Sequence, residues 1–342
     1  MIKTTFIIPG LLLFMLMTGC TQETAFRHTG SIERLHPELD KIIAPGTLPE
    51  LLAEGFNWIE GPLWLTDENA LVFSDIPENT ILRWDENRGL QHYLSPSGYT
   101  GTPSRSGHSG SNGLLLNSEG GLVLCQHGDR RIALMDACSC KPMPKFITLA
   151  DNFEGKRFNS PNDGVFSADG SLYFTDPAFG MQNGYNDSLR ELDFAGVYRL
   201  DTNGEVSLIT DSLSTPNGIG LSPDEQSLYV AVSGLESGLI WVEYSLNKQG
   251  LPREGQLFFD AGPAADSLKG VPDGMDIRSD GILFATGPGG TWIFRPDGTP
   301  LGIVKTGQLT SNCTLDEKEE YLYMTCDSLL LRIKIVSGDS SL

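Results

Sequence analysis

The stretch NDGVFSADGSLYFT, residues 162–175, decides the fold, because an apolar run, a tight turn and a second apolar run follow one another. Two further runs, at residues 197–200 and 206–209, are rich in β-branched and aromatic residues, so four consecutive short strands are predicted. Similar units recur along the chain. Each begins with an oxygen-bearing side chain, at Glu60, Asn112, Asn162, Asn217, Asp273 and Asn312.

The spacing of these units predicts a repeat architecture. Their starts lie 39 to 56 residues apart, which is typical of propeller blades or solenoid units. Four strands per unit and no helical period predict an all-β chain, folded as a six-bladed β-propeller with four-stranded blades. The last unit, which ends at residues 329–333, is one strand short. The run at residues 48–53 would supply it, so we expect an N-terminal strand to close the ring.

The N-terminus is typical of an export signal, since Lys3 precedes an apolar stretch that is too short to span a bilayer. The Thr-Gly-Cys ending at Cys20 resembles a bacterial lipobox, although Met17 stands where leucine is usual. We therefore predict a lipoprotein signal peptide at residues 1–19, a lipidated Cys20 with a tether at residues 20–45, and one propeller domain at residues 46–342. The expected location is the bacterial cell envelope, periplasmic or outer-membrane, with a secreted protein as the alternative.

The net charge limits the kinds of binding partner, and the cysteine spacing argues against a disulfide framework. The formal net charge of −20 argues against nucleic acid and against an anionic membrane surface, so membrane contact is expected only through the lipid on Cys20. The five other cysteines form an odd set without the regular spacing of a disulfide framework. Cys125 and Cys326 lie in strand-like runs and are predicted to be small core residues.

If the six units are blades around one axis, their first side chains form a ring of converging oxygens. Two carboxylates, at Glu60 and Asp273, would stand among four asparagine amides. Hard oxygen donors with two negative charges suit one divalent cation such as Ca²⁺ or Mg²⁺. Six ligating side chains would leave no room for substrate, so some members must bind substrate instead. The alternative interpretation is that these Asn-Gly and Asp-Gly pairs only form turns.

Two inserts are predicted to cover the face that carries these oxygens, at residues 95–111 and 177–196. His127 follows a strand of the second unit, and it either reaches the pocket or caps a loop. His108, in the first insert, is a further candidate. A Gly-x-Ser-x-Gly elbow is absent from the sequence, so a serine nucleophile is not supported.

Several motifs resemble the senescence marker protein/gluconolactonase family of six-bladed propellers, in order along residues 40–336. They are Glu60-Gly61-Pro62-Leu63-Trp64, Asn159-Ser160-Pro161-Asn162-Asp163-Gly164, Thr215-Pro216-Asn217-Gly218 and Pro272-Asp273-Gly274-Met275-Asp276. The Ser-Pro-Asn-Asp pattern and residues 126–131 resemble the bacterial gluconolactonase-like members. The resemblance implies one divalent ion, commonly calcium, at the propeller centre and hydrolysis of sugar lactones.

The same resemblance implies roles for individual residues. Glu60, Asn217 and Asp273 match the family's metal ligands, and Asn162 matches an asparagine that joins the metal shell or holds substrate. Asp273 is also the implied general base. Ser160 stands where animal members have arginine, so their sugar contacts do not carry over. We assign the metal to Glu60, Asn162, Asn217 and Asp273, the substrate to Asn112, Asn162 and His127, and catalysis to Asp273.

The predicted function is metal-dependent hydrolysis of a small-molecule sugar lactone. Ca²⁺ is the expected ion, with Mg²⁺, Zn²⁺ or Mn²⁺ as alternatives. One alternative function is a phosphotriesterase-like hydrolase. Another is a non-catalytic propeller that binds a partner at the cell envelope and uses calcium as a structural pin.

Overall fold

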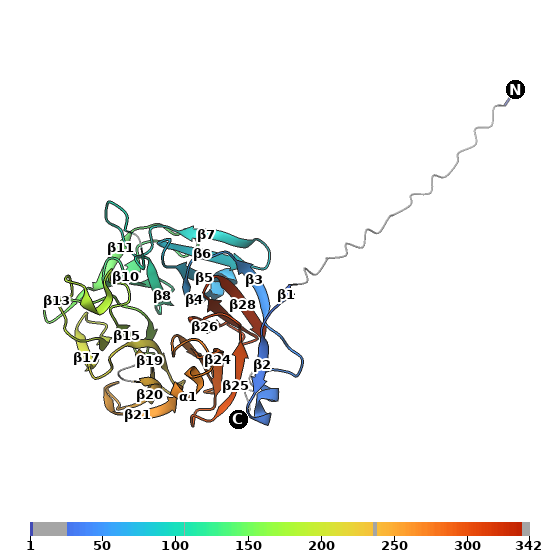
Figure 1. Cartoon of the computed structure of the whole chain (residues 1–342). Coiled ribbons are helices and arrows are strands. Elements are labelled where there is room, and N and C mark those ends of the chain that lie inside the picture. The colour runs from blue at the N-terminus through green and yellow to red at the C-terminus, as the bar shows by residue number, and fades with distance from the viewer. Residues whose placement is uncertain (3–25, 106, 235–237, 337–342) are drawn as a thin grey trace.

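The computed structural model describes residues 1–2, 26–105, 107–234 and 238–336. Six antiparallel sheets follow one another in chain order around a central axis, so the colours of Figure 1 run round the ring from blue to red. The predicted six-bladed β-propeller with four-stranded blades is confirmed. Apart from residues 1–2, the predicted signal peptide and Cys20 lie outside the described residues. Within the described ranges, no helix is long and apolar enough to cross a membrane.

The first three blades follow the predicted repeat. Blade one consists of β4 (Ile59–Leu65), β5 (Ala70–Asp75), β6 (Thr80–Asp85) and β7 (Gly89–Leu94), with the 3-10 helix η2 (Thr66–Glu68) between its first two strands. Blade two consists of β8 (Ser111–Leu116), β9 (Leu122–Gln126), β10 (Arg131–Met135) and β11 (Phe146–Ala150), followed by the small hairpin β12 (Asn152–Phe153) and β13 (Lys156–Arg157). Blade three consists of β14 (Gly164–Phe166), β15 (Leu172–Asp176), β16 (Gly196–Leu200) and β17 (Val206–Thr210), with η3 (Gly184–Asn186) in its insert.

The remaining blades complete the ring. Blade four consists of β18 (Pro216–Leu221), β19 (Ser227–Gly234), β20 (Gly238–Leu246) and β21 (Pro252–Asp260), and the single-turn helix α1 (Gly262–Ala265) follows it. Blade five consists of β22 (Met275–Ile277), β23 (Leu283–Gly287), β24 (Gly290–Phe294) and β25 (Pro300–Lys305). Blade six contributes β26 (Asn312–Leu315), β27 (Tyr321–Cys326) and β28 (Leu329–Lys334).

An N-terminal strand closes the ring, as predicted. Strand β3 (Glu50–Glu54) pairs antiparallel with β28, and Ala53 lies opposite Leu330. In Figure 1 this blue strand lies beside the red strand of the last blade. The two ends of the propeller are thereby held together by backbone hydrogen bonds.

The described part of the predicted tether, from residue 26 on, packs against the propeller. Strand β1 (Arg27–His28) pairs with β3, strand β2 (Ser31–Arg34) pairs with β25, and η1 (Pro37–Lys41) follows. Leu39, Ile42 and Ile43 are buried in the core between blades five and six. The prediction of a tether up to residue 45 was therefore wrong for this part. Pro37 occupies the first turn of this 3-10 helix, where proline is well tolerated.

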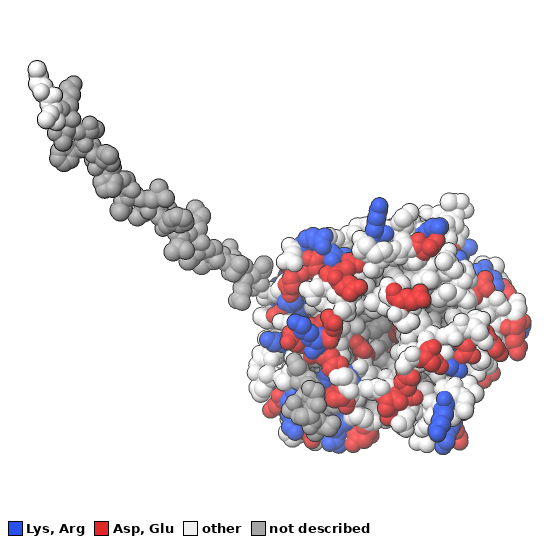
Figure 2. Space-filling model, turned by 180° about the vertical axis from the view of Figure 1, so that it is seen from behind, with Lys and Arg blue, Asp and Glu red and all other residues white. Residues whose placement is uncertain are grey.

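Apolar side chains are buried between neighbouring blades. Phe73 and Trp84 of blade one, for example, pack in one cluster with Tyr323 of blade six. Cys125, Cys313 and Cys326 are free and buried, so the predicted core positions of Cys125 and Cys326 are confirmed. The sequence did not indicate the disulfide that joins Cys138 to Cys140. On the face shown in Figure 2, acidic side chains are spread widely among fewer basic ones.

The glycine of the repeat is required by the close approach of neighbouring inner strands. Gly61 has a φ of +51°, and a Cβ there would lie 2.1 Å from the carbonyl oxygen of Asn112. A Cβ on Gly218 would lie equally close, at 2.1 Å, to the carbonyl oxygen of Asp273. Both glycines lie within inner strands, β4 and β18, so Glu60-Gly61 and Asn217-Gly218 are not simple turns.

Candidate active site

A cavity of about 440 Å³ lies on the propeller axis and is lined by the first side chains of five blades. They are Glu60, Asn112, Asn162, Asn217 and Asp273. Every residue that the sequence assigned to metal, substrate or catalysis lines this one cavity, since His127 is also part of its wall.

Asn312 is the one ring member that does not line this cavity. It borders a second cavity of about 390 Å³, together with Asp163, Asp276 and later residues of the inner strands. Its Nδ2 lies 3.5 Å from Oδ2 of Asp163, and its side chain also hydrogen-bonds Glu60. The expected ring of six is therefore a ring of five, with Asn312 further along the axis behind Glu60.

The three asparagines of the cavity form a chain of hydrogen bonds. Nδ2 of Asn112 donates to Oδ1 of Asn162 at 2.7 Å, and Nδ2 of Asn162 donates to Oδ1 of Asn217 at 2.6 Å. Nδ2 of Asn217 then donates to Oγ of Ser233 at 2.9 Å. The amides are therefore positioned by one another rather than by solvent. Oδ1 of Asn112 is buried and accepts no hydrogen bond, so its capacity as an acceptor is unsatisfied in the protein alone.

His127 forms a hydrogen bond to the middle amide of this chain of asparagines. Its Nε2 lies 3.2 Å from Oδ1 of Asn162, and burial lowers its pKa to about 3. The ring is therefore neutral at physiological pH, and Nε2 carries the hydrogen that it donates to Asn162. The sequence left open whether His127 reaches the pocket or caps a loop. In the structure it lies in the wall of the cavity. His108 lines the cavity as well.

The carboxylates of the site disfavour one another's charge. Burial, followed by the negative charge of Asp163, raises the pKa of Glu60. Burial, followed by the charge of Glu60, raises the pKa of Asp273. Burial also raises the pKa of Asp163 itself to about 7. Asp163 was not predicted from the sequence, because in Asn-Asp-Gly it resembles an ordinary turn residue. Its only signal was its place next to a ring asparagine.

This donor set fits a divalent cation. Within the described residues, no group of three or more His, Cys, Asp and Glu side chains could hold a metal, so a cation here would need amide oxygens as well. The carboxyl groups of Glu60 and Asp273, beside amide oxygens of which one lacks a donor, provide a hard, anionic cradle. A positive charge between Glu60 and Asp273 would relieve their repulsion.

The insert at residues 177–196 covers the cavity, as predicted, and contributes an apolar wall. Ala178, Phe179, Met181 and Tyr185 line the space opposite the amides. Trp58, Ile76 and Val271 add further apolar surface. Within the described residues, no lysine or arginine lines this cavity. The sequence did not single out these side chains, because apolar residues in a long insert have no pattern that separates a cavity wall from surface.

Ser160 ties this insert to the site. Its Oγ donates to the carbonyl oxygen of Pro177 at 2.6 Å and accepts from the N–H of Gly180 at 2.9 Å. The backbone N–H groups of Asn159 and Ser160 both donate, at 2.7 Å, to the buried carboxylate of Asp176. The residue that replaces the arginine of animal members thus holds the covering insert in place.

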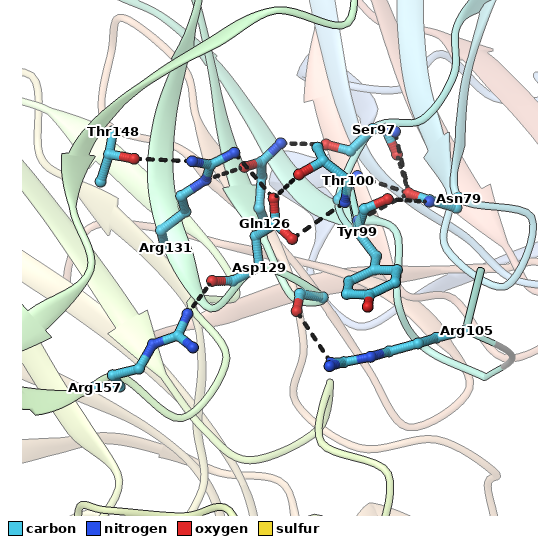
Figure 3. A network of polar contacts seen from close by, with 12 residues as sticks. Asn79, Ser97, Tyr99, Thr100, Arg105, Gln126, Asp129, Arg131, Thr148 and Arg157 are labelled. Carbon is cyan, nitrogen blue, oxygen red and sulfur yellow. Dashed lines mark hydrogen bonds and ion pairs between the residues drawn. The ribbon is translucent and has the colours of Figure 1, made fainter. Parts of the chain in front are cut away.

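The insert at residues 95–111 is held by a separate polar network, shown in Figure 3. Oδ1 of Asn79 accepts the N–H of Gly98 at 2.7 Å, and Asp129 accepts the hydroxyl of Thr100 at 2.6 Å. The Arg105 guanidinium lies 4.1 Å from the centre of the Tyr99 ring. Because His108 belongs to this insert, the network fixes one side of the cavity wall.

The fold and the cavity together define a six-bladed propeller with an axial site of carboxylates and amides. Residues 58–328 match the family described as SMP-30/Gluconolactonase/LRE-like region. The chain therefore belongs to this family, and the resemblance seen in its motifs is confirmed.

Individual relatives agree with this assignment. A gluconolactonase of Zymomonas mobilis is 39% identical over 317 residues, which cover 89% of this chain and 86% of the relative. Regucalcin of Xenopus laevis is 23% identical over 286 residues, which cover 82% of this chain and 87% of the relative. The solved structure of a gluconolactonase from Xanthomonas campestris superposes with a TM-score of 0.75 at 27% identity, covering 90% of this chain and 99% of that one.

Proposed function

We propose that this protein hydrolyses a sugar lactone to the corresponding open-chain acid in the axial cavity, with the help of one divalent cation. The observation that carries the proposal is the convergence of Glu60, Asp273 and three linked asparagines on one cavity. Gluconolactonases of similar sequence and fold support the choice of lactone as the substrate class.

Glu60, Asn162, Asn217 and Asp273 are the residues that would hold the cation. Their oxygens are the hard donors that calcium prefers, and magnesium, manganese and zinc remain alternatives for the test. When bound, such an ion polarises a carbonyl oxygen and lowers the pKa of water.

Asp273 is proposed to act as the general base. Its carboxylate takes a proton from the attacking water, whose oxygen forms a bond to the lactone carbonyl carbon. The carbon–oxygen bond of the lactone ring then breaks, and the leaving ring oxygen takes up the proton, which gives a hydroxy acid. Oδ1 of Asn112 accepts a hydrogen bond from a substrate hydroxyl, and Trp58 and Tyr185 cover the apolar faces of the sugar ring.

A substrate panel tests the proposal. Purified full-length protein, treated with chelator, is assayed with sugar lactones, acyl lactones and phosphotriesters, each with calcium, magnesium, manganese or zinc added back. Rapid hydrolysis of sugar lactones that depends on an added cation is the expected result. No turnover of any substrate, together with a melting temperature that falls on chelation, would instead favour a non-catalytic, calcium-pinned propeller.

We also propose that the protein is a lipid-anchored component of the bacterial cell envelope, with secretion as the alternative. The support is the export signal and the lipobox-like sequence that ends at Cys20.

A further inference from the structure

Ser233, at the end of β19, connects the amide chain to the blade that carries Asp273. Its Oγ donates to the carbonyl oxygen of Pro272 at 2.5 Å and accepts from Nδ2 of Asn217 at 2.9 Å. Pro272 directly precedes Asp273 in the chain. The side chain of Ser233 also lines the cavity.

These two hydrogen bonds determine the direction of the whole amide chain. The carbonyl oxygen of Pro272 can only accept, so the single hydroxyl hydrogen of Ser233 is committed to it. Oγ then has only lone pairs to offer, and Asn217 must present its NH₂ group to them. Oδ1 of Asn217 therefore faces Asn162, whose own NH₂ group donates to it, and Asn162 turns its Oδ1 toward Asn112.

The direction of these hydrogen bonds determines which side-chain atom of Asn112, at the far end of the amide chain, is left without a partner. With the hydrogen bonds running this way, the free atom is Oδ1 of Asn112, a buried acceptor without a partner. If the chain were reversed, the far end would be an NH₂ group, which repels a cation and accepts nothing. Asn217 also hydrogen-bonds the carboxyl group of Asp273, but a carboxyl group can donate or accept, so that contact alone does not set the direction.

We propose that Ser233 is a positioning residue that orients the three asparagine amides, so that Oδ1 of Asn217, which accepts one hydrogen bond, keeps a lone pair for the cation and Oδ1 of Asn112 stays free for the substrate. This inference rests on the proposed function. Hydroxyls in the second strands of other blades also bond the backbone of inner strands: Ser74 donates to the carbonyl of Asn112 at 2.9 Å, and Thr325 donates to that of Asn312 at 3.2 Å. Ser233 combines a bond of this kind with a contact to a ring amide.

The test compares Ser233→Ala and Ser233→Thr with Thr325→Val, which removes a buried hydroxyl from β27 without touching the amide chain. Calcium binding to the chelator-treated full chain is measured by isothermal titration calorimetry. Ser233→Ala is expected to bind calcium about tenfold more weakly, the scale of one lost hydrogen bond, because the amides are free to turn. Ser233→Thr keeps the hydroxyl and is expected to stay within about twofold of the wild type, as is Thr325→Val.

A second measurement does not depend on calcium or on hydrolysis. In protein labelled with ¹⁵N-asparagine, the side-chain NH₂ group of Asn217 is expected to exchange with solvent about tenfold faster in Ser233→Ala and at the wild-type rate in the two other variants. Wild-type exchange and calcium affinity in Ser233→Ala would overturn the inference. Faster exchange of the Asn217 NH₂ group together with weaker calcium binding in a folded Ser233→Thr would also overturn it. The threonine variant therefore remains informative if the alanine variant does not fold. A wild type that hydrolyses no lactone would overturn the proposed function, while the exchange measurement would still test Ser233.

Discussion

Gly180 lies directly against the ring of His127: a Cβ on Gly180 would come within 2.4 Å of Cγ of the histidine. The covering insert therefore holds the side chain that supports Asn162. Gly180→Ala is expected to displace the ring or lift the insert, and to lower kcat/KM about tenfold, mainly through a higher KM. Steady-state kinetics on the best lactone of the panel measure the effect.

The matched control for this prediction is Gly262→Ala in α1, outside the cavity. The nearest atom to its added methyl group would be Oδ1 of the exposed Asp260 side chain, at 3.0 Å, and that side chain can move. Its kinetics should equal those of the wild type. Unchanged kinetics in Gly180→Ala would show that the position of His127 does not matter for turnover.

Asp273→Asn tests the proposed base with little change of shape. Hydrolysis is expected to fall by about 10³-fold, since an amide cannot take up the proton from water. Because an amide needs no proton to be buried as a neutral group, the substitution should also raise the stability of the cation-free protein at neutral pH. Lactone assays and thermal melts with chelator measure the two effects. Asp266→Asn, at an exposed position, is the control, and turnover retained by Asp273→Asn would remove its assigned role.

Cys20→Ser tests the proposed anchor. The variant is expected to lose metabolic labelling with palmitate and to appear in the soluble fraction, because the thiol is the site of lipid attachment. Cys138→Ser, in the propeller, provides a control for the loss of a cysteine. Continued labelling of Cys20→Ser would contradict the lipobox interpretation.

The repeat allowed the fold and most of the site to be predicted from sequence. Glu60, Asn162, Asn217 and Asp273 occupy the same place in four of the six units, and equivalent places in a closed ring face the same axis. Their convergence follows from topology alone. Asn312 shows the limit of this argument, because a residue can begin its unit and yet lie further along the axis than the others.

Other parts of the site depend on contacts that have no periodic signal. Ser233 lies in a second strand, and its importance comes from hydrogen bonds to two residues that are 16 and 39 positions away. Asp163 acquires its effect on Glu60 only when two blades bring the carboxyl groups together. The packing of Leu39 and Ile43 under blade six was hidden in the same way, since a short segment without alternation gives no evidence of where it docks.

The cation-free protein is expected to become less stable as the pH rises from 6.5 to 8. Burial raises the pKa of Asp163 and of Asp176 to about 7, and the pKa of Glu60 is raised as well. These groups bind protons in the folded protein that the unfolded chain has already lost, so the stabilisation present at low pH disappears as the pH rises. The expected loss is roughly 3 kcal/mol of unfolding free energy.

Urea denaturation with chelator at the two pH values measures this loss. The pH range starts at 6.5 because His127 has the opposite effect at lower pH. Its lowered pKa makes the protein more stable as the pH rises toward the ordinary histidine pKa, and this effect ends there. Added calcium should flatten the dependence, since it favours the ionised forms of Glu60 and Asp273. Stability that rises between pH 6.5 and 8 without a cation would contradict the burial of these carboxyl groups.

The lining of the cavity predicts selection against phosphorylated lactones. Its charged side chains are the carboxylates of Glu60 and Asp273, and no lysine or arginine among the described residues reaches it. A phosphate group would have to leave water for a space walled by Phe179 and Met181, where no cationic side chain compensates for its charge. We expect kcat/KM for 6-phosphogluconolactone to be at least about 100-fold below that for gluconolactone, with calcium present.

Two variants test the cause. Met181→Lys places a positive charge in the wall and should reduce the difference in kcat/KM between the two lactones. Met181→Leu keeps the wall neutral and should leave that difference unchanged. Equal rates for the two lactones in the wild type would mean that the phosphate stays outside the cavity, and that the covering insert does not enclose the substrate.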